Sequence, residues 1–308
     1  MQIALGTMNF GKRTPAPEAE RITLRALERG ITVFDTANVY NDGESESILG
    51  RALGKKRASC TVASKVGLAR TRGKPEGLSR AAIAAAIDAT LARLGTDHLD
   101  YYYLHAPDHA TSIEESLDAM AALVAAGKVR AWGVSNYAAW QILDMQTIAA
   151  ARALPPPAIS QVIYNVLIRD IEIEYVPFTR RHAIHTTVYN PLAGGLLTGD
   201  HAKDADVAKG SRFDGNEFYR RRYWTGAMFE RIAQLDAIAR EEQLSLIELA
   251  YAWVAGRPGV DSILVGPATV AHLDAAIDAC AKTLSATAVE RIDALHREWR
   301  GTDTTYVR

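Results

Sequence analysis

The sequence is poor in cysteine and has no long apolar run. Its 308 residues include only two cysteines, Cys60 and Cys280. Two distant thiols form no disulfide framework and fit a reducing compartment. No segment approaches the roughly 18 uninterrupted apolar residues that a membrane span needs, and MQIALGTMNFG (1–11) lacks the basic leader and apolar core of a secretory signal. We therefore expect a soluble globular protein of the cytoplasm.

The sequence also lacks an excess of charge of one sign. Lysine and arginine number 35 and aspartate and glutamate 36, which gives a formal net charge of −1. A balanced chain offers no electrostatic attraction for nucleic acid or for an anionic membrane surface. We expect neither as a partner.

Several site patterns are missing as well. The G-x-G-x-x-G fingerprint of Rossmann dinucleotide sites does not occur, and Ser135 lacks the G-x-S-x-G setting of hydrolases. His105 and His109 have the spacing of a metal pair, but Pro107 lies between them and disfavours a helix. Since no acidic or thiol cluster completes a site, we expect no metal.

What the chain does contain is a regular alternation of short apolar runs and helical patterns. We expect strands near 3–7, 31–35, 60–65, 98–104, 129–134, 158–162, 184–189 and 261–265. Their apolar character suits strands buried on both faces. Repeated strand–helix–strand units indicate a parallel sheet. We predict an α/β protein with one domain over residues 1–308, a closed (β/α)8 TIM barrel.

Helix signals support this order. In residues 79–94, apolar side chains recur on one face and Ser79 can cap the start. Ser112 and Glu115 form a capping-box pattern. Gly30, Gly95 and Gly127 follow helical segments, where left-handed C-caps are expected. Residues 287–299 indicate an extra C-terminal amphipathic helix.

Two segments interrupt the rhythm. Residues 155–157 are three prolines, which we interpret as a rigid loop entering the sixth strand, with an interdomain linker as the alternative. Residues 193–226, after the seventh strand, are rich in glycine, arginine and aromatic residues. Long loops in compact domains are usually functional or disordered, and this composition favours function.

Four chemically active residues follow the predicted strands. Asp35 ends the second strand, Tyr40 comes shortly after it, Lys65 ends the third and His105 the fourth. Strand C-termini converge at one mouth of a parallel barrel. There, Lys65 could lower the pKa of the Tyr40 phenol, Asp35 could hold Lys65, and His105 could bind a substrate oxygen or relay a proton. Each residue alone has a structural explanation as a cap, a surface charge or a packing group, but the four together predict a proton-transfer site.

The later strand ends predict a second set of groups. Ser135, Asn136 and Gln161 could hold a carboxamide, and Tyr189 could stack on a ring. The glycine-rich stretch 190–199 and GPATV (266–270), which runs into a helix, could both approach phosphates. A ring, an amide and phosphates together describe a nicotinamide dinucleotide.

At this point the chain resembles the aldo-keto reductase superfamily. The similar segments are FDTANVYNDGESESILG (34–50), ASK (63–65), YYLHAPD (102–108), GVSNY (133–137) and YNPLAGGLLTG (189–199). GSRFDGN and YRRRYW within 210–224, with the terminal YVR, look like the aflatoxin-aldehyde and succinic-semialdehyde reductase subgroup. The resemblance covers essentially the whole chain.

The resemblance implies an eight-stranded barrel that binds NADPH and transfers hydride to a carbonyl. Tyr40 would protonate the alkoxide, Lys65 and Asp35 would tune it, and His105 would orient the carbonyl. The cofactor residues would be Ser135, Asn136, Gln161, Tyr189, Asn190, Leu192, Gly194, Gly195, Lys209, Arg212, Gly266, Thr269 and His272. His272 and Ala276 replace the Gln and Asn usual in the family, which weakens the prediction of NADPH over NADH. The subgroup resemblance also suggests a homodimer.

The substrate is expected to be a small carbonyl compound. Arg222 and Arg308 could grip a substrate carboxylate, although a solvated charge run is the simpler interpretation of Arg220–Arg222. Met8, Tyr219, Trp224 and Tyr306 could form an apolar wall or could simply pack the long loop.

Two rival functions remain open. One is a cofactor-sensing regulatory subunit with negligible turnover. The other is a barrel isomerase that uses Lys65 or His105 as a base and needs no nicotinamide. Of the three, we favour an NADPH-dependent reductase of aldehydes, with ketones as a further substrate class.

Overall fold

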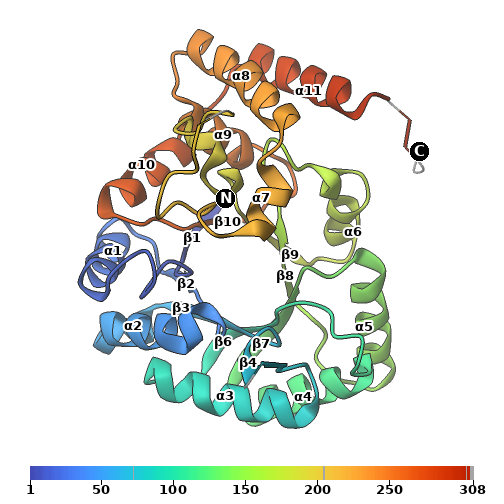
Figure 1. Cartoon of the computed structure of the whole chain (residues 1–308). Helices are drawn as coiled ribbons and strands as arrows, with labels where there is room; N and C mark the ends of the chain where they lie inside the picture. Colours follow the sequence, from blue (N-terminus) through green and yellow to red (C-terminus); the bar gives the residue numbers. More distant parts are fainter. Residues whose placement is uncertain (72, 204, 303, 306–308) are drawn as a thin grey trace.

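The chain forms a closed parallel barrel in a computed structural model that describes residues 1–71, 73–203, 205–302 and 304–305. Eight of the described strands close the barrel in the order β1-β10-β9-β8-β7-β6-β3-β2 (Figure 1). They are β1 Gln2–Gly6, β2 Val33–Asp35, β3 Thr61–Val66, β6 Leu99–Leu104, β7 Val129–Ser135, β8 Ile159–Ile163, β9 His185–Tyr189 and β10 Ser262–Val265. The predicted (β/α)8 barrel is confirmed, and the predicted strands agree with these within about two residues.

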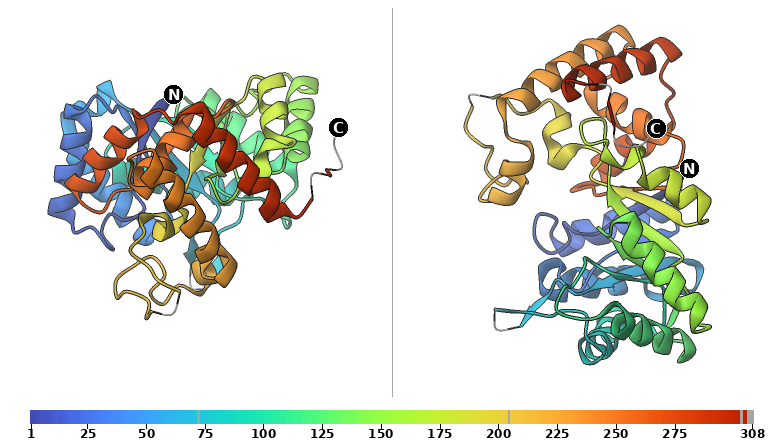
Figure 2. Two further views of the ribbon diagram at one scale, coloured as in Figure 1. Left: turned by 90° about the horizontal axis from the view of Figure 1, so that it is seen from above. Right: turned by 90° about the vertical axis from the view of Figure 1, so that its right-hand side faces the viewer.

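The loops that follow the strands project from one end of the barrel, which we call the mouth. The segment after β9 and the small hairpin of β4 (Arg70–Thr71) and β5 (Lys74–Pro75) lie on this same side (Figure 2, right). The post-β9 segment begins with the 3-10 helix η4 (Ala193–Thr198) and includes the short helix α7 (Glu217–Tyr223). A long loop was expected after β9 from the sequence, but α7 and the β4–β5 hairpin were not expected.

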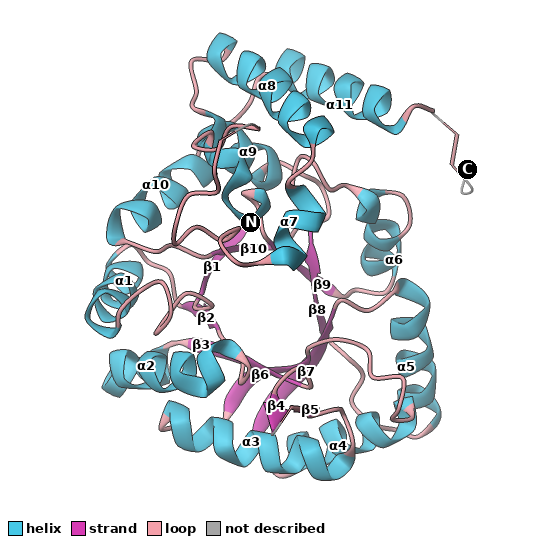
Figure 3. Cartoon of the chain, viewed as in Figure 1, coloured by secondary structure: helices cyan, strands magenta, loops and turns pink. Residues whose placement is uncertain are grey.

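Helices surround the barrel on the outside (Figure 3). The connecting helices are α1 Ala16–Glu28, α2 Glu44–Leu53, α3 Arg80–Leu94, α4 Ile113–Ala125, α5 Ala139–Ala151, α6 Tyr175–Arg181, α8 Gly226–Glu241 and α9 Leu246–Ala255. After β10 come α10 (Val270–Cys280) and the extra C-terminal helix α11 (Ala286–Arg300). Among the described residues, no helix is both long enough and apolar enough to cross a bilayer.

The helix signals hold with one exception. Ser79 caps α3 by accepting a hydrogen bond from the Ala82 N–H, at 3.3 Å. Ser112 likewise caps α4 by accepting from the Glu115 N–H. The predicted capping box is wrong, however, because the Glu115 carboxylate accepts a hydrogen bond from the Arg80 N–H at the start of α3. Glu115 therefore joins two helices instead of closing its own.

The layer between strands and helices is apolar, as the pattern of α3 predicts. Ile83, Ile87, Leu91 and Leu94 are all buried. Gly133 in β7 is required by close packing, since a Cβ at this position would meet the Ile159 carbonyl oxygen at 2.2 Å. The triple proline lies in the loop between α5 and β8, where the Pro155 carbonyl accepts a hydrogen bond from the Trp132 indole. This placement confirms the loop interpretation.

Candidate active site

The four residues predicted for proton transfer converge at the mouth. Asp35 ends β2, Lys65 lies near the end of β3, and His105 directly follows β6. These strands are neighbours in the barrel, so their ends share one part of the rim. Tyr40 begins the 3-10 helix η1 (Tyr40–Gly43) just beyond β2.

Lys65 connects this group. Its side chain is fully buried, and its ammonium donates to the Asp35 carboxylate and to the Thr36 carbonyl at 2.8 Å. The same ammonium lies 3.4 Å from the Tyr40 hydroxyl. On its other oxygen, Asp35 accepts a hydrogen bond from the Gln161 amide at 2.9 Å. A buried cation is tolerated because its hydrogen atoms all find acceptors.

The charges near Tyr40 act on its pKa in opposite directions. Burial is the largest effect and raises the pKa of Tyr40, Lys65 lowers it, and Asp35 raises it again. The net pKa of Tyr40 is therefore raised from its ordinary value, although Lys65 acts in the predicted direction and lowers it. Burial also lowers the pKa of Lys65, but Asp35 and Tyr40 outweigh it and the net pKa is raised. The pair at neutral pH is therefore a neutral phenol beside a charged ammonium.

His105 completes the group from the side of β6. Its ring is nearly perpendicular to that of Tyr40, with 5.9 Å between ring centroids. Burial, followed by the Lys65 charge, lowers the pKa of His105 well below 6.5. A neutral imidazole at this position can donate one hydrogen bond to a carbonyl oxygen. Its Nδ1 atom has no hydrogen-bond partner among the described residues.

The predicted carboxamide-binding residues form a connected network. Asn136, whose φ is 64°, donates to the His105 carbonyl and to the Ser135 hydroxyl, both at 3.0 Å. Its side-chain oxygen accepts a hydrogen bond from the Tyr189 hydroxyl at 2.7 Å. Ser135 is buried at the end of β7, and Gln161 is buried within the neighbouring strand β8. The predicted residues are thus brought together, but the Asn136 amide already binds His105, Ser135 and Tyr189, and the Gln161 amide binds Asp35.

The glycine-rich loop after β9 combines a tight contact with open space. The Asn190 side chain accepts from the Gly194 N–H at 2.6 Å and donates to the Tyr223 hydroxyl, which fixes the turn around Leu192. A Cβ on Gly194 would meet the Tyr219 ring at 2.7 Å. Gly195 has a φ of 102° and nothing within 4 Å of a built Cβ. The open backbone at Gly195 fits the predicted approach of a ligand.

Two arginines gather near this loop. Arg212 donates to the Asn9 side-chain oxygen at 3.0 Å, and Arg13 donates to the Ser211 carbonyl at 3.3 Å. Burial and then the proximity of Arg212 lower the pKa of Arg13. Neither guanidinium forms an ion pair with a carboxylate in the described part of the chain, so the two can receive an anion. Arg13 was not predicted as an anion-binding residue, and the one signal in the sequence that could have indicated it was its position in the loop after β1. The predicted Lys209 is exposed.

The predicted anion site at the start of α10 is already partly occupied. Thr269 caps the helix by accepting from the His272 N–H at 3.2 Å, and the His272 side chain is exposed. The Gly266 carbonyl accepts a hydrogen bond from Asn9 at 3.1 Å. The Val270 N–H donates to the Glu18 carboxylate at 3.0 Å. An acidic side chain from α1 therefore lies where an incoming phosphate was expected.

The described residues among those predicted to bind substrate divide into a group near the proton-transfer residues and one residue that packs the long loop. Tyr219 affects the pKa of Tyr40 and therefore lies near it, and the Met8 sulfur accepts a hydrogen bond from Arg212. Arg222 acts to lower the pKa of Tyr189 and lies 4.4 Å over the Phe218 ring, and no described carboxylate pairs with it. Trp224 instead packs on His201, Phe213 and Phe229, which favours the loop-packing alternative. Tyr306 and Arg308 lie outside the described residues.

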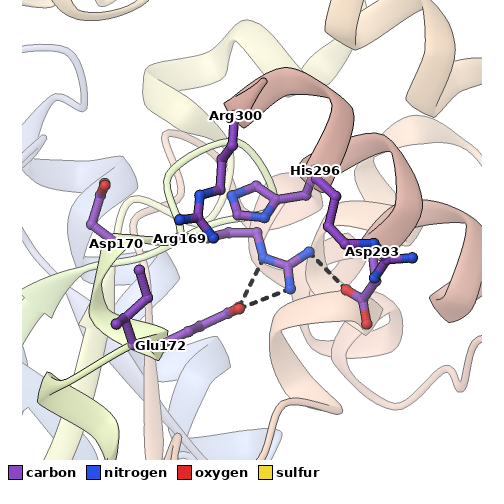
Figure 4. A pocket seen from close by; sticks show the side chains of 8 residues that line it. Arg169, Asp170, Glu172, Asp293, His296 and Arg300 are labelled. Carbon is purple, nitrogen blue, oxygen red and sulfur yellow. Dashed lines mark hydrogen bonds and ion pairs between the residues drawn. The ribbon is translucent and has the colours of Figure 1, made fainter. Parts of the chain in front are cut away.

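A cavity of about 270 Å³ lies away from this group, between the loop after β8 and α11 (Figure 4). Three of its charged side chains pair with one another. Arg169 binds Glu172 at 2.8 and 2.9 Å and Asp293 at 2.7 Å, and its guanidinium stacks on Trp253. We interpret this cluster as the attachment of α11 to the barrel, because Arg169 from the loop after β8 pairs with Asp293 of α11.

Comparison with known proteins agrees with the geometry. A sequence model of the Aldo/keto reductase family matches residues 2–297. The chain is 35% identical to human Aflatoxin B1 aldehyde reductase member 2, over 96% of this chain and 85% of that protein. It is 33% identical to human Aflatoxin B1 aldehyde reductase member 4, over 96% and 92% of the two chains.

A relative with a different description is also similar. The Arabidopsis thaliana protein described as a probable voltage-gated potassium channel subunit beta is 33% identical, over 84% of this chain and 80% of its own. The family match nevertheless spans nearly the whole barrel, and it agrees with the resemblance to aflatoxin-aldehyde reductases. The chain therefore belongs to the aldo/keto reductase family of oxidoreductases.

Proposed function

We propose that the protein is an NADPH-dependent reductase of aldehydes, with ketones as a further substrate class. The observation that carries this proposal is the contact of Lys65 with both Asp35 and Tyr40, beside a neutral His105. A protonated phenol and a neutral imidazole can together bind one carbonyl oxygen. We further propose that residues 1–308 act as one domain, in the cytoplasm and as a homodimer.

The residues present fit a nicotinamide dinucleotide. Tyr189 offers a ring at the end of β9, and Gly195 leaves open space beside the loop backbone. Among the residues that the structure describes, Arg13 and Arg212 have no carboxylate partner. NADPH would supply a hydride to the carbonyl carbon. Ser135, Asn136 and Gln161 would hold the carboxamide, which requires some of their mutual hydrogen bonds to be exchanged for bonds to the ligand.

The chain's own residues would manage the proton. His105 and Tyr40 hold the carbonyl oxygen, and Tyr40 gives its hydroxyl proton to that oxygen as negative charge develops there. The Lys65 ammonium stabilises the resulting phenolate, and Asp35 keeps the ammonium in place. General-acid catalysis of this kind typically contributes about 10²–10⁴-fold to the rate.

We propose that the preferred substrates are small aldehydes that bear a carboxylate. Arg222 supports this proposal, because it lies beside Tyr189 without a carboxylate partner among the described residues. A guanidinium binds a carboxylate through two parallel hydrogen bonds. Tyr219 and Met8 would line the apolar part of the pocket.

The test is the oxidation of NADPH, followed by its absorbance, with a panel of carboxylated and neutral aldehydes. Fluorescence titration with NADPH and NADH measures cofactor binding independently of turnover. Tight NADPH binding without turnover of any aldehyde would favour the rival regulatory role, which the similarity to the plant channel subunit keeps open. Reaction without added nicotinamide would favour the isomerase.

A further inference from the structure

The interior of the barrel beneath the four mouth residues is hollow and polar. A cavity of about 120 Å³ lies there, and its lining includes Asp35, Tyr103, Gln161, His185, Thr187 and Ser262. The interiors of such barrels are usually filled by bulky branched apolar side chains. This volume holds several water molecules, since each occupies about 30 Å³ in the liquid.

The cavity extends from the start of the strands to Asp35. Gln2, Thr61 and His185 lie at the N-terminal ends of their strands, line the cavity and are partly or fully exposed. Asp35, at the other end, is only 4% exposed. The cavity therefore connects a buried carboxylate with solvent on the face of the barrel opposite the mouth.

Polar groups line both ends of the cavity. The His185 ring nitrogen Nε2 is 2.7 Å from the Ser262 hydroxyl at the lower end. Higher up, Tyr103, Thr187 and Gln161 line the cavity, and Gln161 donates to Asp35. Burial lowers the pKa of His185, so this imidazole is neutral near pH 7 and can accept a proton.

Lys65 has no direct access to solvent at the mouth. Its side chain is fully buried, and its ammonium contacts Asp35, Thr36 and Tyr40. Of these partners, Asp35 is the one that lines the cavity. A proton that returns to Lys65 through its described contacts can therefore come by way of the Asp35 carboxylate.

We propose that this cavity is a proton path that recharges Tyr40 after each turnover, from solvent at the start of the strands. The proposal rests on the proposed reductase function. After Tyr40 has protonated the product, an N–H bond of Lys65 breaks and the O–H bond of Tyr40 forms again. The Lys65 amine then takes a proton from a cavity water through the Asp35 carboxylate, and the hydroxide left behind is neutralised by a proton passed inward from solvent.

Thr187→Leu tests the proposal, because it fills the cavity with an apolar side chain. The matched control is Thr186→Val on the same strand; Thr186 is buried outside the cavity and bonds Thr179. In stopped-flow experiments, the first turnover uses the proton already on Tyr40. We expect the Thr187→Leu enzyme to oxidise the first equivalent of NADPH at the wild-type rate. Its later turnovers should be at least tenfold slower than those of the wild type, with a larger solvent isotope effect in D2O. The control should match the wild type in both phases.

His185→Phe blocks the lower end and decides the question if Thr187→Leu fails to fold. Wild-type steady-state rates and D2O effects in a folded cavity variant would overturn the proton path while leaving the reductase function intact. If the wild-type protein instead failed to oxidise NADPH with every aldehyde tested, the proposed function would be overturned, and the proton path with it. The two failures are therefore distinguishable.

Discussion

The Glu18 carboxylate accepts a hydrogen bond from the Val270 N–H, at 3.0 Å, so an anion from α1 occupies the N-terminus of α10. This bond is the main reason that the pKa of Glu18 is lowered. A cofactor phosphate at this helix start would meet a like charge. We expect Glu18→Gln to tighten NADPH binding about three- to tenfold at low salt, and NADH binding much less, because the substitution removes a like-charge repulsion that salt screens.

Fluorescence titration of both cofactors measures this effect, with Glu20→Gln, an exposed residue of the same helix, as the control. Equal changes for NADPH and NADH would mean that the adenosine phosphate binds elsewhere.

Tyr40→Phe removes the proposed acid and little else. We expect kcat to fall by about 10²–10⁴-fold, while the dissociation constant for NADPH changes little, because the ring remains. Tyr175→Phe is the control, since its hydroxyl is buried without a hydrogen-bond partner among the described residues. A Tyr40→Phe enzyme with near-normal kcat would remove Tyr40 from the mechanism.

His105 makes the fold sensitive to acid. Its pKa in the folded protein is well below the ordinary 6.5, so the unfolded chain binds more protons between these two values. The contribution of the neutral His105 to the free energy of unfolding is therefore fully present above pH 6.5 and is lost as the pH falls below it. We expect His105→Gln to flatten the decline in unfolding free energy, by urea denaturation, between pH 7.5 and 5.5. The exposed His109→Gln should leave the decline unchanged.

Arg222→Ala tests the carboxylate preference. Losing a charged hydrogen-bond donor costs about 1.5–3 kcal/mol, so KM for an aldehyde such as succinic semialdehyde should rise about 10- to 100-fold. Neutral aldehydes should be nearly unaffected. Arg221→Ala is the matched control, because Arg221 is exposed and pairs with Glu217. An equal rise in KM for carboxylated and neutral aldehydes would rule out binding of the substrate carboxylate by Arg222.

Gly133→Ala should destabilise the barrel without touching the mouth residues. The added methyl group would lie 2.2 Å from a backbone oxygen of β8, which cannot move without disturbing the sheet. Overpacking of this kind costs about 1–3 kcal/mol. Gly6→Ala, whose Cβ would be 3.5 Å from its nearest neighbour, should have a smaller effect on urea midpoints.

The sequence predicted the barrel because most strands are short, largely apolar runs that a helix signal follows. It also brought Asp35, Tyr40, Lys65 and His105 together, because three of them mark the ends of parallel strands. What it could not provide were contacts set by distant segments. The Glu18–Val270 bond joins residues 252 positions apart, and the Arg13–Arg212 pair depends on the path of a long loop.

The net pKa of Tyr40 shows a second limit. The residue types predicted a lowered value, since an ammonium next to a phenol favours the phenolate. Burial of the hydroxyl is the larger effect, and burial depends on how the loops pack. The polar cavity escaped prediction for a similar reason. Thr187 lies in the short run HTTVY, and its inward direction follows only from the register of β9.

The pairing of β1 with β10 has a consequence for biosynthesis. One edge of the first strand has no partner until residues 262–265 have left the ribosome, roughly tens of seconds later at ordinary elongation speeds. During that time the nascent sheet is open, and unpaired strand edges invite aggregation. Cotranslational chaperones should therefore hold this polypeptide until its last strand is made.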